Sequence, residues 1–209
     1  MHRDVLTANQ LELLPMIREF SGDYYLAGGT AIALCLGHRR SVDFDLMTPD
    51  RIKKQRIRKT IDRFPQPVSD ILFEDSEQLH IMINAVRVTF LSYPYPVVAG
   101  TDFDEVIRMP DLLTLAAMKA YALGGRAKWK DYVDLFFLLR DHFSLRQISE
   151  HAKGLFGAFF NEKLFREQLC YYQDIDDSEA VDFITRAVPE SKIKGFLTNT
   201  ATAPFTSNL

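Results

Sequence analysis

The chain has 209 residues, of which 47% are hydrophobic and 25% are charged, and its formal net charge is −3 at pH 7. This length and composition predict one compact domain, or one domain with a helical extension, with enough apolar side chains for a core. The slightly acidic charge excludes a chain-wide basic surface of the kind that binds nucleic acid through its phosphates.

The predicted elements of the first half are mixed, and those of the second half are helical. In chain order we expect a helix over 8–20, a strand over 24–26, a helix over 30–36, a strand over 42–47, a basic helix from 51, and strands over 68–73, 79–83 and 86–91. Beyond Pro110 we expect helices over 112–123, 132–139, 145–156, 163–172 and 178–188, and then a loose polar tail after 195. Strands early and helices late predict an α+β fold with a small mixed sheet and a C-terminal helical bundle.

Two aspartates share one face of the predicted strand over 42–47. Asp43 and Asp45 alternate with the apolar Val42, Phe44 and Leu46, so the carboxylates lie about 6.6 Å apart along the chain. Carboxylates this close repel each other unless a hard cation lies between them. Because Mg²⁺ prefers oxygen ligands and is often held by one or two carboxylates plus substrate phosphates, the pair predicts a metal site.

A glycine pair precedes these aspartates. Gly28 and Gly29 follow the predicted strand over 24–26, and Thr30 is placed to cap the helix that comes next. A helix N-terminus with bare N–H groups binds anions, so this segment predicts a phosphate cradle. The alternative is an ordinary glycine turn before a strand with one polar face, but the order and closeness of the two features favour the functional interpretation.

The predicted helices of the second half each contain an isolated charge. Lys119 is the only charge inside 112–123, and Asp134 is the only charge inside 132–139. A charge among apolar neighbours is costly unless it is paired or used. Either the two form a structural ion pair between packed helices, or both lie at the rim of a nucleotide pocket, and the second interpretation is favoured.

Basic residues are clustered locally. The run from Arg51 to Lys59 carries six positive charges. We favour a solvated helix face for this run, and the alternative is a track for RNA phosphates. The two cysteines, Cys35 and Cys170, are too few for a disulfide framework or a zinc site. No signal peptide and no apolar run of membrane-spanning length is apparent, so we expect a cytoplasmic protein without a membrane partner.

Two blocks of the sequence carry a family resemblance. The Gly-Gly pair followed by Ser41-Val-Asp-Phe-Asp45 resembles the signature of nucleotidyltransferases with the polymerase-β-like fold. The fuller string from Ala27 to Leu46 is similar to the AbiEii/AbiGii toxin family, whose members act in bacterial toxin–antitoxin and phage-defence systems. The second block, a lysine-bearing helix followed by Lys130-Asp-Tyr-Val-Asp-Leu135, resembles the later motifs of that family.

The resemblance implies a Mg²⁺-dependent transfer of a nucleotidyl group from an NTP to an RNA 3′ end, such as that of tRNA, or to a protein. It also implies a cognate antitoxin as partner, a nucleotidyltransferase core over 1–108, a helical region over 109–195 that completes the active site, and a loose tail over 196–209. The implied catalytic residues are Asp43, Asp45, Lys119 and Asp134, with both Asp43 and Asp45 as metal ligands. The implied nucleotide-binding residues are Gly28, Gly29, Thr30, Arg40, Ser41, Lys130 and Asp131.

One feature departs from the wider superfamily, in which a neighbouring strand often supplies a third carboxylate. The predicted strand over 86–91 contains no acid, although Asp134 is a replacement to consider. A two-metal mechanism usually needs more oxygen ligands than Asp43 and Asp45 provide. The alternative function is therefore a degenerate module that binds nucleotide or a protein partner without turnover.

Overall fold

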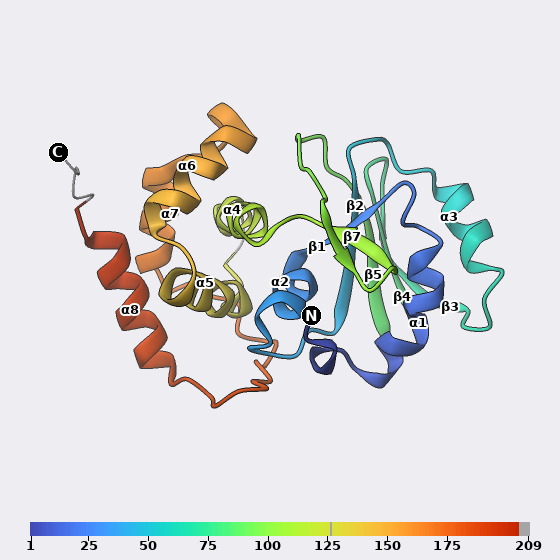
Figure 1. The fold of residues 1–209 in the computed structure, drawn as a ribbon, viewed down its shortest axis with the longest axis horizontal. Coiled ribbons are helices and arrows are strands. Elements are labelled where there is room, and N and C mark those ends of the chain that lie inside the picture. The colour runs from blue at the N-terminus through green and yellow to red at the C-terminus, as the bar shows by residue number, and fades with distance from the viewer. Residues whose placement is uncertain (126, 205–209) are drawn as a thin grey trace. The chain divides into compact units, whose positions relative to one another are not determined.

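The structure is a computed structural model that describes residues 1–125 and 127–204. The chain divides into two compact units, Met1–Asp111 and the remainder from Leu112. The first unit combines a sheet with helices and the second is built of helices (Figure 1). The predicted α+β class is confirmed.

The first unit is built on a five-stranded mixed sheet with the strand order β1-β2-β5-β4-β3. Its strands are β1 (Tyr25–Ala27), β2 (Asp43–Thr48), β3 (Val68–Glu74), β4 (Gln78–Ile83) and β5 (Val86–Ser92). Strand β2 runs parallel to β5, and the other neighbouring pairs are antiparallel. The two-residue turn Asn84-Ala85 joins β4 to β5 with positive φ at both residues, as tight hairpins require.

Helices cover both sides of this sheet. They are α1 (Ala8–Arg18), α2 (Gly28–Leu36) and α3 (Lys54–Ile61), and a 3₁₀ turn over Arg3–Val5 precedes them. Helices α1 and α3 lie on one side of the sheet and α2 lies on the other (Figure 1). Thr7 and Gln10 form a capping box that fixes the start of α1. A hairpin of β6 (Thr101–Phe103) and β7 (Ile107–Met109), which the sequence did not predict, completes the unit.

Alternation along the strands separates a buried face from a polar one. Phe44 and Leu46 of β2 are fully buried, as are Val88 and Phe90 of β5, whereas Asp43 and Asp45 are partly exposed. Burying apolar side chains at every second position is the main force that fixes the register, since a slip by one residue would expose them all. The facing predicted for Asp43, Phe44, Asp45 and Leu46 is confirmed, whereas Val42, predicted to share the apolar face, precedes β2 and is 42% exposed.

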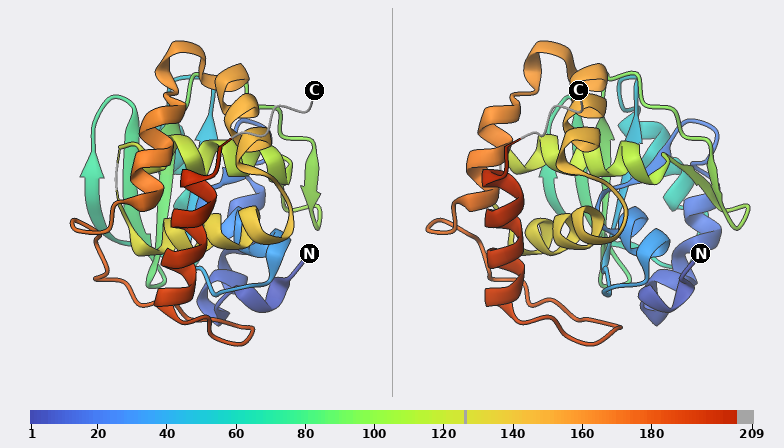
Figure 2. Two further views of the ribbon diagram at one scale, coloured as in Figure 1. Left: turned by 90° about the vertical axis from the view of Figure 1, so that its left-hand side faces the viewer. Right: turned by 60° about the vertical axis from the view of Figure 1, so that its left-hand side comes forward.

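The second unit packs its helices around the apolar face of α5. Its helices are α4 (Leu112–Leu123), α5 (Trp129–Asp141), α6 (Leu145–Phe156), α7 (Glu162–Cys170) and α8 (Glu190–Thr202), with a 3₁₀ turn over Gly157–Phe159. Tyr132, Leu135 and Phe136 of α5 are fully buried. Helices α7 and α8 lie side by side (Figure 2). None of the helices within the described ranges is long and apolar enough to cross a membrane.

Two sequence predictions near the C-terminus are wrong. The structure has no helix over 178–188, which is an irregular segment, and α8 begins instead at Glu190, directly after Pro189. The tail predicted to be loose from 196 continues this helix to Thr202, and 205–209 lie outside the described residues. The reason is tertiary packing: Ile193, Leu197 and Ala201 recur every four residues and are buried, which outweighs the weak helix propensity of this polar sequence.

Candidate active site

The turn between β1 and α2 brings the backbone against a carboxylate. Gly28 is the first residue of α2 and has φ +70°, a conformation that favours glycine. A Cβ atom at Gly28 would lie 2.0 Å from Oδ2 of Asp45. Only glycine therefore lets Asp45 lie against this turn.

The next glycine makes room for two side chains of the loop that follows α2. A Cβ atom at Gly29 would lie 2.8 Å from Nη2 of Arg39 and 3.5 Å from Oγ of Ser41. Arg39 and Ser41 are both buried, at 2% and 6% exposure. Gly37, in the left-handed conformation at the end of α2, turns the chain back so that this loop reaches Gly29.

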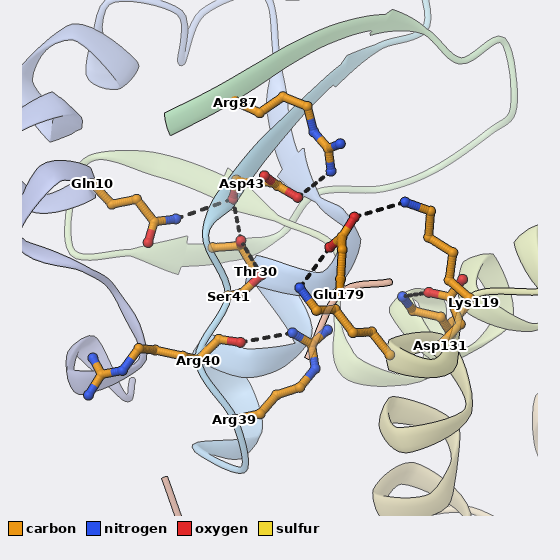
Figure 3. A network of polar contacts seen from close by, with 12 residues as sticks. Gln10, Thr30, Arg39, Arg40, Ser41, Asp43, Arg87, Lys119, Asp131 and Glu179 are labelled. Carbon is orange, nitrogen blue, oxygen red and sulfur yellow. Dashed lines mark hydrogen bonds and ion pairs between the residues drawn. The ribbon is translucent and has the colours of Figure 1, made fainter. Parts of the chain in front are cut away.

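Thr30 has a different role from the one predicted. The residue that caps α2 is Ala27, and no side chain makes a cap hydrogen bond there. The Thr30 hydroxyl lies 2.8 Å from Oγ of Ser41 and donates a hydrogen bond to the carbonyl oxygen of Asp43 (Figure 3). Thr30 is third in α2, so its side chain faces the β2 strand and ties α2 to the start of that strand.

The two aspartates of β2 differ in their surroundings. Asp43 forms an ion pair with Arg87 of β5, and its carbonyl accepts a hydrogen bond of 3.3 Å from Nε2 of Gln10 (Figure 3). The Arg87 guanidinium offsets part of the repulsion between the two carboxylates. Asp45 instead lies against Gly28.

On β5, the strand beside β2, residues other than acids stand opposite the two aspartates, where a third carboxylate would be expected. In the parallel pairing, Asp43 lies opposite Arg87 and Asp45 lies opposite Thr89. Within residues 1–125 and 127–204 there is no group of three or more His, Cys, Asp and Glu side chains placed to hold a metal ion. Two same-face carboxylates beside a glycine turn still fit one Mg²⁺, since its remaining ligands come from substrate phosphates and water.

Arg40, the second of two adjacent arginines and predicted to bind nucleotide, is bound instead to the backbone of the N-terminal segment. Arg40 is exposed, and its Nη1 donates a hydrogen bond of 3.1 Å to the carbonyl of Asp4. Arg39 is the arginine beside Gly29, and its Nη1 also donates to the carbonyl of Arg40. Arg39 is thus a residue that the sequence analysis did not select, because the conformation of the loop decides which of two adjacent arginines turns inward.

Three of the six cations in the basic run over 51–59 pair with two acids of the same unit. Lys54 and Arg58 both pair with Glu74, at 3.0 and 2.7 Å, and Arg56 pairs with Asp23 at 2.9 Å. These pairs agree with the solvated helix face that we favoured over an RNA track.

In the second unit, Lys119 of α4 joins both aspartates of α5. Its Nζ lies 2.5 Å from Oδ1 of Asp131 and 3.1 Å from Oδ2 of Asp134. All three side chains are at most 5% exposed. The ion pair that the sequence analysis set against a catalytic role is therefore present, and Asp131 is part of it.

Lys130 also has a partner within the second unit. The carboxylate of Glu179 accepts from Lys130 at 2.7 Å and from Lys128 at 3.0 Å. Glu179 belongs to the irregular segment after α7, which is fixed to α5 because the backbone N–H of Trp129 donates to the carbonyl of Asp176. The two ammonium groups lower the pKa of Glu179 to about 2. Nothing in the local sequence indicated this pairing.

Replacing Glu179 with glutamine is expected to lower stability in a pH-dependent way. The pKa of Glu179 is lower in the folded protein than in the unfolded chain, so its stabilisation is full above about pH 4.5 and is lost as the pH falls towards 2. Because the group is partly exposed, the effect at pH 7 is about 0.2–1 kcal/mol. Urea unfolding at pH 7 and near pH 2 should show a difference only at pH 7. Glu167→Gln is the control, because this carboxylate is 60% exposed and lies 3.7 Å from the ammonium of Lys163.

A valine at Gly29 is expected to weaken NTP binding before it unfolds the protein. The new side chain would displace Arg39 and Ser41 from the turn, and the flexible end of Arg39 can move without disrupting the core. Calorimetric titration with NTP should show the loss, while thermal melts stay close to wild type. Gly22→Val is the matched control, because a Cβ at Gly22 meets no atom within 4 Å. Equal NTP affinity in the two variants would mean that the turn is merely structural.

Comparisons with known proteins agree with this arrangement. The family model "Nucleotidyl transferase AbiEii toxin, Type IV TA system" matches residues 16–199. The chain is 29% identical over 187 residues to "Uncharacterized protein aq_aa25" of Aquifex aeolicus (strain VF5), which covers 85% of this chain and 89% of that protein. Among solved structures, MenT4, a nucleotidyltransferase toxin of Mycobacterium tuberculosis H37Rv, has a TM-score of 0.60 at 14% identity over 94% of this chain and 85% of that chain. The resemblance and the nucleotidyltransferase fold are confirmed.

Proposed function

We propose, because this chain belongs to the AbiEii nucleotidyltransferase toxin family, that it transfers a nucleotidyl group from an NTP in a reaction that requires Mg²⁺ at Asp43 and Asp45. Nucleotidyl transfer itself follows from the family, as do an NTP substrate, divalent-metal use and a cognate antitoxin. The observation that carries the metal assignment is that Asp43 and Asp45 share one face of β2 and that Asp45 lies against Gly28.

The carboxylates would bind the cation, and the glycine turn with its neighbours would bind the phosphates of the nucleotide. Asp43 and Asp45 would hold the cation, which when bound supplies charge neutralisation for the phosphates. The N–H groups at the start of α2, the Ser41 hydroxyl and the Arg39 guanidinium would bind the phosphate oxygens. Catalysis by these residues is positioning and electrostatic stabilisation, as is usual for phosphoryl transfer.

We propose that Lys119 and Asp134 support the active site by positioning helices and do not contact the nucleotide themselves. Their buried cluster with Asp131 joins α4 to α5 and would hold those helices in the geometry that the reaction needs. Lys130 would bind nucleotide only after exchanging its Glu179 partner for a phosphate.

The acceptor would be an RNA 3′ end, such as that of tRNA, or a protein side chain, and the reaction would take place in the cytoplasm. A second candidate function is nucleotide binding without turnover. The observation that favours it is the presence of Arg87 and Thr89 opposite the two aspartates, where a third carboxylate would help to bind a second metal.

One experiment separates these functions. The purified protein is incubated with each of the four α-³²P-labelled NTPs, with total RNA or with protein extract, and with Mg²⁺ or EDTA. Label transferred to one acceptor class in Mg²⁺ and not in EDTA supports the proposed enzyme. Nucleotide binding in calorimetry with no transfer to either class would support the non-catalytic module.

A further inference from the structure

The polar face of the sheet continues beyond the two aspartates as an ordered row of side chains. Asp45 of β2 pairs with Thr89 of β5, Thr89 pairs with His80 of β4, and His80 pairs with Phe73 of β3. Residues directly opposite each other on neighbouring strands point to the same face. The row therefore leads from a candidate metal ligand to an exposed aromatic ring at the edge of the sheet.

The outer end of this row is an aromatic pair. The rings of Phe73 and His80 meet edge to face with centroids 5.6 Å apart. Phe73 is 48% exposed. His80 is partly exposed, and its Nε2 lies 2.9 Å from Oε1 of Gln78. An exposed aromatic pair in line with a reaction centre is a surface on which a base can stack.

His80 contributes to this surface as a neutral ring. Partial burial, and then the positive charge of Arg87, lower the pKa of His80 below its ordinary value. At neutral pH the ring is uncharged, so it is suited to stacking rather than to binding a phosphate.

The position of the glycine turn indicates on which side of Asp45 the phosphates of the NTP would lie. Ala27 of β1 pairs with Asp45, and Gly28 follows it, so the phosphate cradle lies on the β1 side of Asp45. In phosphoryl transfer the attacking and leaving oxygens are roughly in line. The leaving phosphates would lie on the β1 side, and the acceptor would approach from the opposite side, which is the side of Thr89, His80 and Phe73.

Asp70, Glu74, Asp75 and Glu77 lie at this edge of the sheet, and the acid next to the platform, Glu74, is neutralised by its partners. Glu74, next to Phe73, is paired with both Lys54 and Arg58 of α3. This local neutralisation removes the repulsion that a lone carboxylate would exert on a phosphate backbone.

We propose that Phe73 and His80 form a stacking platform for the terminal base of a single-stranded nucleic-acid acceptor. The inference rests on the proposed function and narrows its acceptor to RNA. Thr89, a small side chain that is 6% exposed, lies between the platform and Asp45. The ribose hydroxyl of the stacked terminal nucleotide would attack the α-phosphate of the NTP, and pyrophosphate and the hydroxyl proton would leave.

The test is the affinity of the full-length protein for a short fluorescein-labelled single-stranded RNA, measured by anisotropy without NTP or metal. Phe73→Ala is expected to weaken binding about 5- to 150-fold, the range expected for the loss of stacking on one base. Phe73→Trp should retain the affinity, and His80→Ala should lower it. Leu72→Ala is the matched control, because Leu72 directly precedes Phe73 in β3, is apolar and is similarly exposed, at 53%.

The outcomes separate this inference from the proposed function. Loss of RNA affinity in Phe73→Ala, with unchanged calorimetric affinity for NTP and an unchanged thermal melt, supports the platform even if no transfer is detected. Loss of NTP affinity instead would overturn it, because the pair would then hold the base of the nucleotide. Equal RNA affinity in Phe73→Ala and Leu72→Ala, or label transferred to protein alone, would also overturn it.

Discussion

Replacing Lys119 with methionine is expected to lower the free energy of unfolding by about 3–5 kcal/mol. The substitution keeps the length and apolar packing of the side chain but removes the ammonium that lies within 3.1 Å of both Asp131 and Asp134. Those carboxylates are 3% and 0% exposed. Water cannot replace the lost partner at such sites, so the cost of burying two negative charges is no longer offset. Urea unfolding followed by circular dichroism measures the change.

Two further variants make this prediction specific. Adding Asp131→Asn and Asp134→Asn to Lys119→Met should recover much of the loss, because the neutral amides are far less costly to bury. Lys163→Met, at a lysine that is 85% exposed, is the control and should be close to neutral. Unchanged stability in Lys119→Met together with lost transfer would contradict the structural cluster and would support the alternative, in which Lys119 acts directly as a catalytic residue at the nucleotide pocket.

The parts of the fold that the sequence predicted are those that local periodicity determines. Alternation along β2 placed Asp43 and Asp45 on one face. The glycine pair located the junction of β1 and α2, although both glycines belong to the first turn of α2 and not to a turn before it. Helix α6 was predicted over its full length, and the structure shows a capping box of Ser144 and Gln147 at its start, which is also a local feature. Such features need no knowledge of distant contacts.

The parts that the sequence did not predict depend on contacts between distant segments. The inward turn of Arg39 rather than Arg40 depends on the loop after α2, and the partner of Lys130 comes from Glu179, 49 residues away. Helix α8 exists because Ile193 and its neighbours on the same face are buried by other helices. The contacts of Arg39 and Lys130 have no signal at short range, whereas the spacing of Ile193, Leu197 and Ala201 is a local helical pattern that the polar composition of the segment masks.

The pairing of β2 with β5 shows which residues stand where a third carboxylate would be expected. Arg87 stands opposite Asp43 and offers charge compensation where a third acid would add repulsion. With Arg87 and Thr89 opposite them, the carboxylates form a site suited to one cation that is completed by substrate phosphates, rather than to a preformed pair of metals.

Replacing Asp45 with asparagine is expected to reduce Mg²⁺-dependent transfer by about 100-fold or more, which exceeds the effect of losing an outer-shell partner of a metal ligand. Asparagine has the same shape, so the close contact with Gly28 is kept and the fold should remain intact. Removing one of two crowded carboxylates also relieves repulsion. The variant should therefore unfold in EDTA at the same temperature as the wild type or slightly above it.

A second readout of the Asp45→Asn variant does not depend on activity. A ligand that binds only the folded state raises the melting temperature, so Mg²⁺ with NTP should stabilise the wild type and not the variant. Asp43→Asn is the informative comparison: it should also lose transfer, but it removes the ion pair with the partly exposed Arg87 and should cost up to about 1 kcal/mol without metal. Full transfer activity in either variant would show that the two aspartates do not hold the metal, and the proposed reaction would then need another centre.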